Sequence, residues 1–139
     1  MWNFIKLLIF SKTILLTPSP IDLHGEVVIV PEQPLTAISA GAHLTVDVTA
    51  IFGGPEAFWK IEEERQKKIP DGTLEARLFT EDGESVLLTY NGLSSSKDKL
   101  LAKLFAEDGV STEVEFVKVV VNSKVPLHDV RITWENASL

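Results

Sequence analysis

The most regular alternation of apolar and polar residues in this chain of 139 residues is Leu44-Thr-Val-Asp-Val-Thr-Ala-Ile51. Successive side chains of an extended strand point to opposite faces, so this segment has one apolar face and one polar face. The apolar face holds Leu44, Val46, Val48 and Ala50. The pattern predicts a half-buried β-strand whose apolar side chains pack against a second layer of strands.

A similar pattern occurs near the other end of the chain, in Asp129-Val-Arg-Ile-Thr-Trp134. It predicts a strand with Val130, Ile132 and Trp134 in the core and the residues between them outside. Further strand-like segments, separated by turn residues, span 26–30, 73–79, 85–90, 100–105 and 114–121. With the N-terminal segment, this makes roughly eight strands at the spacing that is typical of a β-sandwich.

A short internal repeat lies within these segments. Ala76-Arg-Leu-Phe-Thr-Glu-Asp-Gly-Glu-Ser85 matches Ala102-Lys-Leu-Phe-Ala-Glu-Asp-Gly-Val-Ser111. Glycine readily adopts the positive φ that a tight turn between antiparallel strands requires. The repeat therefore predicts two hairpins on the same Glu-Asp-Gly turn, one pairing 73–79 with 85–90 and the other pairing 100–105 with 114–121.

Residues 55–68 have the features of a short helix. Pro55 suits the first helical position, and acidic residues come first while Arg65, Lys67 and Lys68 come last, which complements the helix dipole. Helices and strands do not alternate, so a layered α/β fold is not expected. We predict one domain over residues 1–139, an all-β, mainly antiparallel sandwich with this helix inserted. In pattern the chain resembles immunoglobulin-like sandwiches, although the cysteine pair of antibody-type domains is missing.

Residues 1–16 form an apolar segment that contains Lys6 and Lys12. A transmembrane helix needs about 20 apolar residues, and this run is shorter and interrupted. A secretory signal needs an unbroken apolar stretch and a small-residue cleavage site, so it is the less favoured interpretation. We interpret the segment as a first strand that ends before Pro18 and Pro20. Because an apolar strand at a sheet edge attracts another chain, we expect a homo-oligomer or a protein partner.

The chain is acidic and contains no cysteine. Its net charge of −7 and pI of about 4.9 disfavour contact with phosphate backbones, so we expect no nucleic-acid partner. The absence of cysteine excludes disulfides, thiolate nucleophiles and cysteine-based zinc sites, and we expect no cofactor. The composition leaves the compartment open, with the cytoplasm slightly favoured over export.

Three histidines are the candidate nitrogen ligands for a metal ion. His24, His43 and His128 lie far apart in the sequence, and Asp47 could complete a site if the strands converged. No His-x-His or His-Glu-x-x-His spacing supports such a site. Isolated histidines are therefore the preferred interpretation, and a metal-binding protein is an alternative.

Aromatic side chains are the best candidates for a binding surface. Phe58 and Trp59 fall on the predicted helix, and Trp2 and Phe4 fall in the N-terminal strand. The sequence has no Gly-x-Ser-x-Gly motif and no phosphate-binding glycine loop, so we do not expect an enzyme. We predict a non-enzymatic binding or assembly protein that acts through protein–protein contacts. A metal-binding protein and an exported domain that binds carbohydrate or surface ligands are the alternatives.

Overall fold

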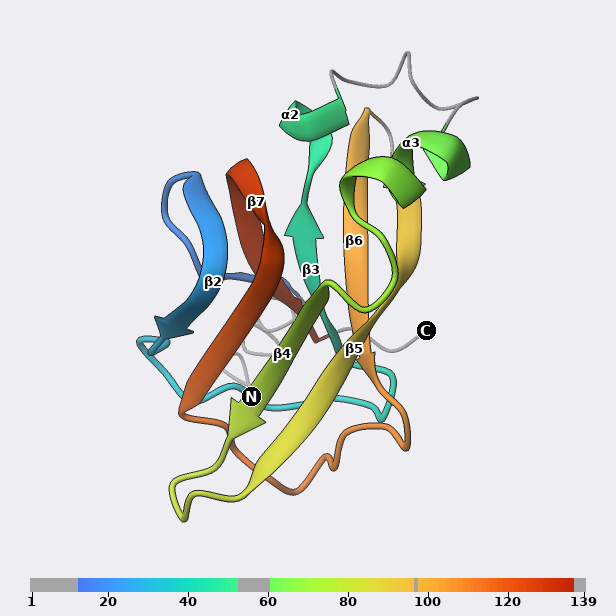
Figure 1. The fold of residues 1–139 in the computed structure, drawn as a ribbon. Helices are drawn as coiled ribbons and strands as arrows, with labels where there is room; N and C mark the ends of the chain where they lie inside the picture. The colour runs from blue at the N-terminus through green and yellow to red at the C-terminus, as the bar shows by residue number, and fades with distance from the viewer. Residues whose placement is uncertain (1–12, 53–60, 97, 137–139) are drawn as a thin grey trace.

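Five antiparallel strands close into a barrel (Figure 1). The computed structural model describes residues 13–52, 61–96 and 98–136. Within these ranges β7 pairs with β3, β3 with β6, β6 with β5 and β5 with β4, and β4 returns to pair with β7. The ring strands are β3 (His43–Asp47), β4 (Leu74–Phe79), β5 (Ser85–Ser96), β6 (Lys99–Ala106) and β7 (Lys118–Glu135).

The long strand β7 closes the ring because its two halves pair with different neighbours. The first half pairs with β4, where Arg77 lies opposite Val120, and the second half pairs with β3, where Val46 lies opposite Ile132. Between the halves Asp129 has a φ of 54°, a left-handed conformation that does not occur in a regular strand. An irregularity of this kind bends a strand and increases its twist, which allows one strand to serve two sides of a ring.

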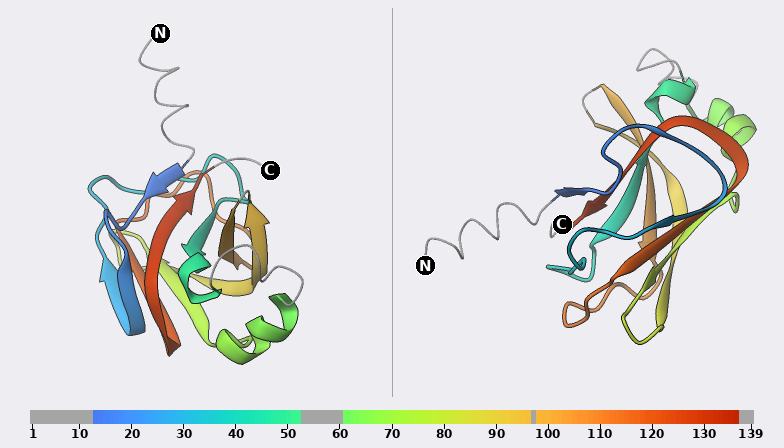
Figure 2. Two further views of the ribbon diagram at one scale, coloured as in Figure 1. Left: turned by 90° about the horizontal axis from the view of Figure 1, so that it is seen from above. Right: turned by 90° about the vertical axis from the view of Figure 1, so that its left-hand side faces the viewer.

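Two further strands lie outside the ring, and both pair with β7. β1 (Thr13–Leu15) pairs with its last residues, and β2 (Ile21–Ile29) pairs with residues 119–130, with register shifts before Gly25. A single bridge between Leu35 and Phe116 adds another pairing outside the ring. In Figure 1 β2 forms one lateral border of the molecule, and the view from above in Figure 2 places it at the same border.

The prediction of an immunoglobulin-like sandwich is wrong. A sandwich consists of two separate sheets, whereas the strands described here belong to one sheet that closes on itself. The predicted inward residues Val130, Ile132 and Trp134 are buried. However, every strand of a barrel also has one inward face, so alternation is the same in both architectures. The predicted strands 114–121 and 129–134 are also not separate, because residues 118–135 form one strand.

The internal repeat predicts both turns correctly but only one of the two hairpins. The Gly83 N–H donates to the Thr80 carbonyl at 3.0 Å, and the Gly109 N–H donates to the Ala106 carbonyl at 3.1 Å, so the turn is the same. The first turn joins β4 to β5, as predicted. After the second turn the chain leaves β6, which pairs with β3 and β5 instead of with the segment that follows.

The strand predicted over residues 44–51 ends early, at Asp47. The Asp47 Oδ1 accepts hydrogen bonds from the backbone N–H of Thr49 at 3.0 Å and from its hydroxyl at 2.6 Å. A side chain that accepts a hydrogen bond from the backbone N–H two residues later competes with the hydrogen bonds between strands. The same hydrogen bond favours the start of a helix. The chain accordingly turns into the short helix α2 (Thr49–Phe52). The Thr49 hydroxyl also accepts the N–H of Leu100 at 2.9 Å, which ties this corner to β6.

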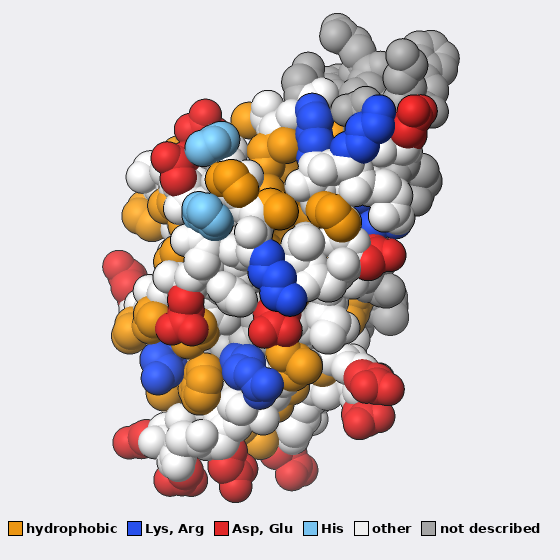
Figure 3. Space-filling view, viewed as in Figure 1, with side chains coloured by type: hydrophobic (Ala, Val, Ile, Leu, Met, Phe, Trp, Pro, Cys, Tyr) orange, Lys and Arg blue, Asp and Glu red, His pale blue; other side chains and the backbone are white. Residues whose placement is uncertain are grey.

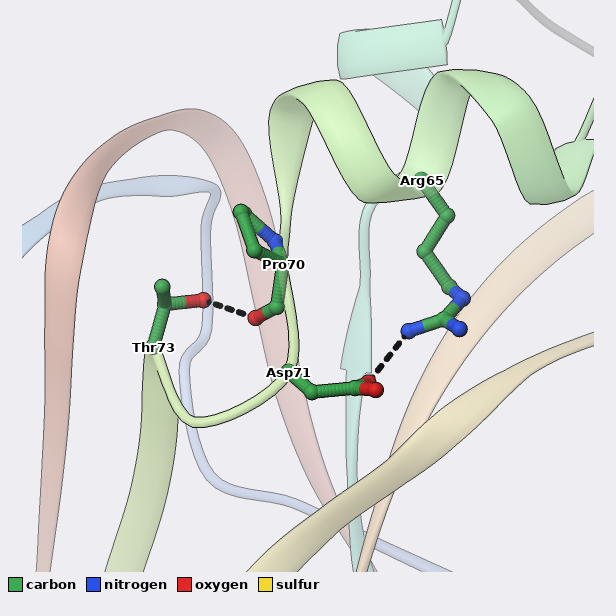
Figure 4. A network of polar contacts seen from close by, with 4 residues as sticks. All are labelled: Arg65, Pro70, Asp71 and Thr73. Carbon is green, nitrogen blue, oxygen red and sulfur yellow. Dashed lines mark hydrogen bonds and ion pairs between the residues drawn. The ribbon is translucent and has the colours of Figure 1, made fainter.

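The predicted helix is present as α3 (Ile61–Lys68), and residues 53–60 lie outside the described part of the chain. Two polar contacts connect the end of α3 to the start of β4 (Figure 4). Arg65 is almost fully buried and donates to the Asp71 carboxylate at 2.5 Å, and the Thr73 hydroxyl donates to the Pro70 carbonyl at 2.6 Å. In the described ranges no helix has the length and apolar character needed to cross a membrane.

One apolar cluster fills the ring and continues beneath β2. Trp134 is its largest fully buried side chain, and its indole Nε1–H donates to the Thr36 carbonyl at 2.8 Å. Leu23 of β2 belongs to the same cluster, so the outer strand packs on the barrel core. Other members come from each ring strand, among them Leu44, Val46, Leu78, Leu88, Leu104, Val121 and Ile132.

Candidate functional site

The aromatic residues predicted for a binding surface, Trp2, Phe4, Phe58 and Trp59, lie outside the described residues. Their proposed role therefore stays a prediction. Of the predicted N-terminal strand 1–16, the described part includes β1, which is an outer strand paired with the end of β7.

The histidines occupy separate environments. His24 on β2 and His128 on β7 are exposed, and the Nδ1 of His128 lies 3.7 Å from the Asp22 carboxylate. His43 on β3 is buried, and Asp47 is engaged at the start of α2. Within the ranges that the structure describes, no three His, Asp or Glu side chains come close enough together to hold a metal ion. The positions of the described His, Asp and Glu side chains therefore provide no support for the metal-binding alternative.

His43 is held in one orientation by two contacts. Its Nδ1 lies 3.0 Å from the Gly41 carbonyl oxygen, and its ring stacks on Phe105 with centroids 4.4 Å apart. Burial lowers the pKa of His43 below its usual 6.5, against the opposing effect of the Gly41 hydrogen bond. The positive charge of Lys103 lowers this pKa and the carboxylate of Glu135 raises it. The imidazole is therefore neutral at pH 7, and we infer that it donates the Nδ1 proton to Gly41.

An open groove of about 350 Å³ lies on the outer face of the barrel, across β1, β7, β3 and β6. The strand register explains which side chains line it. Leu15, Thr133 and Thr45 lie opposite one another on β1, β7 and β3, and Arg131 lies opposite Asp47 in the next outward row. Because residues directly opposite in a sheet share a face, these side chains necessarily point into the same space.

Hydroxyl and carboxylate groups form a hydrogen-bonded chain in this groove. The hydroxyls of Thr13 and Thr133 donate to the two oxygens of Glu135, at 2.9 Å and 3.4 Å. The hydroxyls of Thr45 and Thr133 also bond each other. Either hydroxyl can be the donor in this contact. Thr45 is buried, so its hydroxyl lies at the bottom of the groove.

Some charged side chains of the groove already bond other groups of the protein, and others do not. Glu135 accepts two hydroxyl groups, and Asp47 accepts two hydrogen bonds from Thr49. Among the described residues, Arg131 and Lys99 have no carboxylate within ion-pair distance. The groove therefore presents two cations, Arg131 and Lys99, beside the three carboxylates of Asp47, Asp98 and Glu135.

The outer strand β2 presents a second candidate surface. Among the described residues β2 pairs only with β7, which leaves its other edge unpaired. Val28 is 54% exposed and Val30 is 72% exposed, whereas Val27 and Ile29 are half-buried. No charged side chain occurs from Val27 to Pro31. From Val27 to Ile29, beyond the register shifts and acidic residues of its first half, β2 has no charge, bulge or proline, and an edge segment of this kind is open to addition of another strand.

The sequence does not reveal this edge, because four consecutive apolar residues, Val27 to Val30, do not show which side of the strand faces solvent. The strand itself was predicted, but its position at the border of the sheet was not. One feature of the sequence pointed to an open edge. The apolar segment that Pro31 terminates contains no lysine or other charged residue that would discourage pairing with another strand.

Figure 3 shows the outer face of β2, β7, β4 and β5, where apolar side chains lie among charged ones. In one row across these strands Val28 lies opposite Val120, Val120 opposite Arg77, and Arg77 opposite Leu87. Acidic side chains gather at the end of the molecule that carries the β4–β5 turn.

Comparisons with protein-family models, with characterised proteins and with solved structures found no match.

Proposed function

We propose that the chain is a non-enzymatic binding or assembly protein that acts through protein–protein contacts at the free edge of β2. The observation that carries this proposal is the edge of β2 with which no strand of the described residues pairs, at Val28, which is 54% exposed, and at Val30 just beyond the strand, which is 72% exposed. Backbone N–H and C=O groups along such an edge are free to bond another extended strand, which is a common mode of protein recognition.

Two features of β2 support this mode. The strand is anchored to the core through the buried Leu23 and through its pairing with β7, so its free edge is held in place for a partner. The half-buried Val27 and Ile29 alternate with the exposed valines, so an added strand would extend apolar surface on both faces of the sheet. Burial of exposed apolar side chains contributes about 25 cal/mol per Å² to association.

The test is a lysine placed on this edge. Val28→Lys should reduce self-association, measured by sedimentation velocity across the micromolar range, at least about tenfold, because strand addition would bury a charge. The matched control is Leu87→Lys, which places the same charge on β5, a ring strand where Leu87 pairs with Arg77 of β4. Leu87 is also exposed, at 37%.

The proposal requires that the wild-type chain and Leu87→Lys associate while Val28→Lys does not. A wild-type chain that remains monomeric throughout the micromolar range would overturn it. Equal association of wild type and Val28→Lys would also overturn it, since the contact would then lie elsewhere.

A further inference from the structure

We propose that the groove across β1, β7, β3 and β6 is a binding site for a neutral sugar ring. The groove has a volume of about 350 Å³, at the lower end of the range of small-molecule sites, which is about 300–1,000 Å³. It shares no lining residue with the edge of β2, so this inference goes beyond the proposed function and does not depend on it.

Positive and negative groups lie side by side in this groove. Arg131 on β7 lies opposite Asp47 on β3 in the strand register, and Lys99 directly follows Asp98 in the sequence. A ligand with a net charge would be attracted by one member of each pair and repelled by the other. A zwitterion would need one end lined by cations alone, and each cation here has a carboxylate beside it. The arrangement therefore favours a neutral ligand.

Hydrogen-bond donors and acceptors are interspersed in the same way. Arg131 and Lys99 can only donate hydrogen bonds, whereas the carboxylates of the groove can only accept them. Arg131 and Asp47 face each other in register but form no ion pair, so one ligand group can bond both. Both hydrogen bonds from Thr49 to Asp47 go to Oδ1, which leaves Oδ2 for such a group. A hydroxyl both accepts and donates, so it satisfies Arg131 and Asp47 together.

Two leucines supply apolar surface for the rest of a sugar ring. Leu101 of β6 continues the row that Arg131 and Asp47 form, and Leu15 of β1, which is 51% exposed, belongs to the neighbouring row. The C–H groups of a ring can pack on these side chains while its hydroxyls bond the charged ones. The described lining residues include no aromatic side chain, whose large apolar face would add affinity, so we expect millimolar dissociation constants.

The test is a titration of the full, isotopically labelled chain with glucose, galactose and mannose, followed by NMR. At least one of these neutral sugars should cause saturable shifts in the backbone amide signals of the groove, which are those of Thr45, Asp47, Leu101, Arg131 and Thr133. The matched charged probes are the uronate and the 2-amino sugar of the same configuration. Both should bind more weakly than the parent sugar, because each would meet a like charge in the groove.

One substitution and its control locate the site. Arg131→Gln removes a cationic donor and should raise the dissociation constant at least about tenfold. Arg77→Gln is the matched control, because Arg77 is also exposed and lies on β4, outside the groove. This variant should bind the sugar as the wild type does. Circular dichroism melting curves that match the wild type would show that both variants are folded.

The absence of saturable shifts in the groove with all three neutral sugars would overturn the proposal. Tighter binding of a uronate or an amino sugar than of its parent would also overturn it, because the groove would then select for charge. An unchanged dissociation constant in Arg131→Gln would exclude this groove as the site. Each of these results would leave the proposed function intact, since that function is tested by the association of Val28→Lys.

Discussion

Replacing Gly109 with alanine should cost more stability than replacing Gly83, although both glycines occupy the same position of the same turn. Gly83 has a φ of 90° and Gly109 a φ of 81°. An L-residue in a left-handed conformation costs about 1–2 kcal/mol, and this term applies equally to both substitutions. The difference between them therefore isolates what the new methyl group meets.

The surroundings of the two glycines are different. A Cβ at Gly83 would have no heavy atom within 4 Å apart from those of Gly83 and its two chain neighbours, whereas a Cβ at Gly109 would lie 3.0 Å from the Ala40 Cβ and 3.2 Å from its carbonyl oxygen. That carbonyl also accepts the N–H of Val110 at 3.1 Å, so the Ala40 backbone cannot move away without losing a hydrogen bond. Overpacking of this kind costs about 1–3 kcal/mol.

We therefore expect Gly83→Ala to lose about 1–2 kcal/mol and Gly109→Ala about 2–5 kcal/mol of unfolding free energy. Urea unfolding followed by circular dichroism measures both values, with the slope of free energy against urea serving as a check on two-state behaviour. Ala40→Gly removes one of the two close atoms, so it should recover part of the loss in the Gly109→Ala background. Equal losses for the two glycine variants would refute the argument, as would a failure of Ala40→Gly to restore any stability.

Two further predictions concern polar side chains at the two ends of β3, His43 at its start and Thr49 just beyond its end. Because burial lowers the pKa of His43 below 6.5, the unfolded chain binds a proton at a higher pH than the folded chain does. The stability margin of the wild type over His43→Gln should therefore be largest above pH 6.5 and shrink as the pH falls through that value, which urea unfolding at several pH values would reveal. A margin that grows on acidification would contradict the neutral, buried imidazole. Thr49→Val should lose about 1–3 kcal/mol, because it leaves the Leu100 N–H without its acceptor, while Thr49→Ser should lose less. Equal thermal stability of Thr49→Val and the wild type would argue against a role for this hydrogen bond.

Little of the candidate site could be predicted from the sequence. The strand around Val28 was predictable, but the valine that faces solvent depends on its partner strand, β7, and on the register shifts before Gly25. The groove combines Thr13 with Glu135, which are 122 residues apart, and no local pattern relates them. The groove and the free edge both arise from neighbours that are remote in sequence.

The sequence by itself determined those features that depend on neighbouring residues. Alternation placed Val130, Ile132 and Trp134 in the core, and the Glu-Asp-Gly segments formed the same turn twice, because side-chain direction and backbone φ are local properties. Tertiary structure alone decided that the sheet closes into a barrel. Closure depends on one bent strand that pairs with β4 along its first half and with β3 along its second. Inward-facing side chains satisfy a barrel and a sandwich equally well, so the pairing of distant strands selects between them.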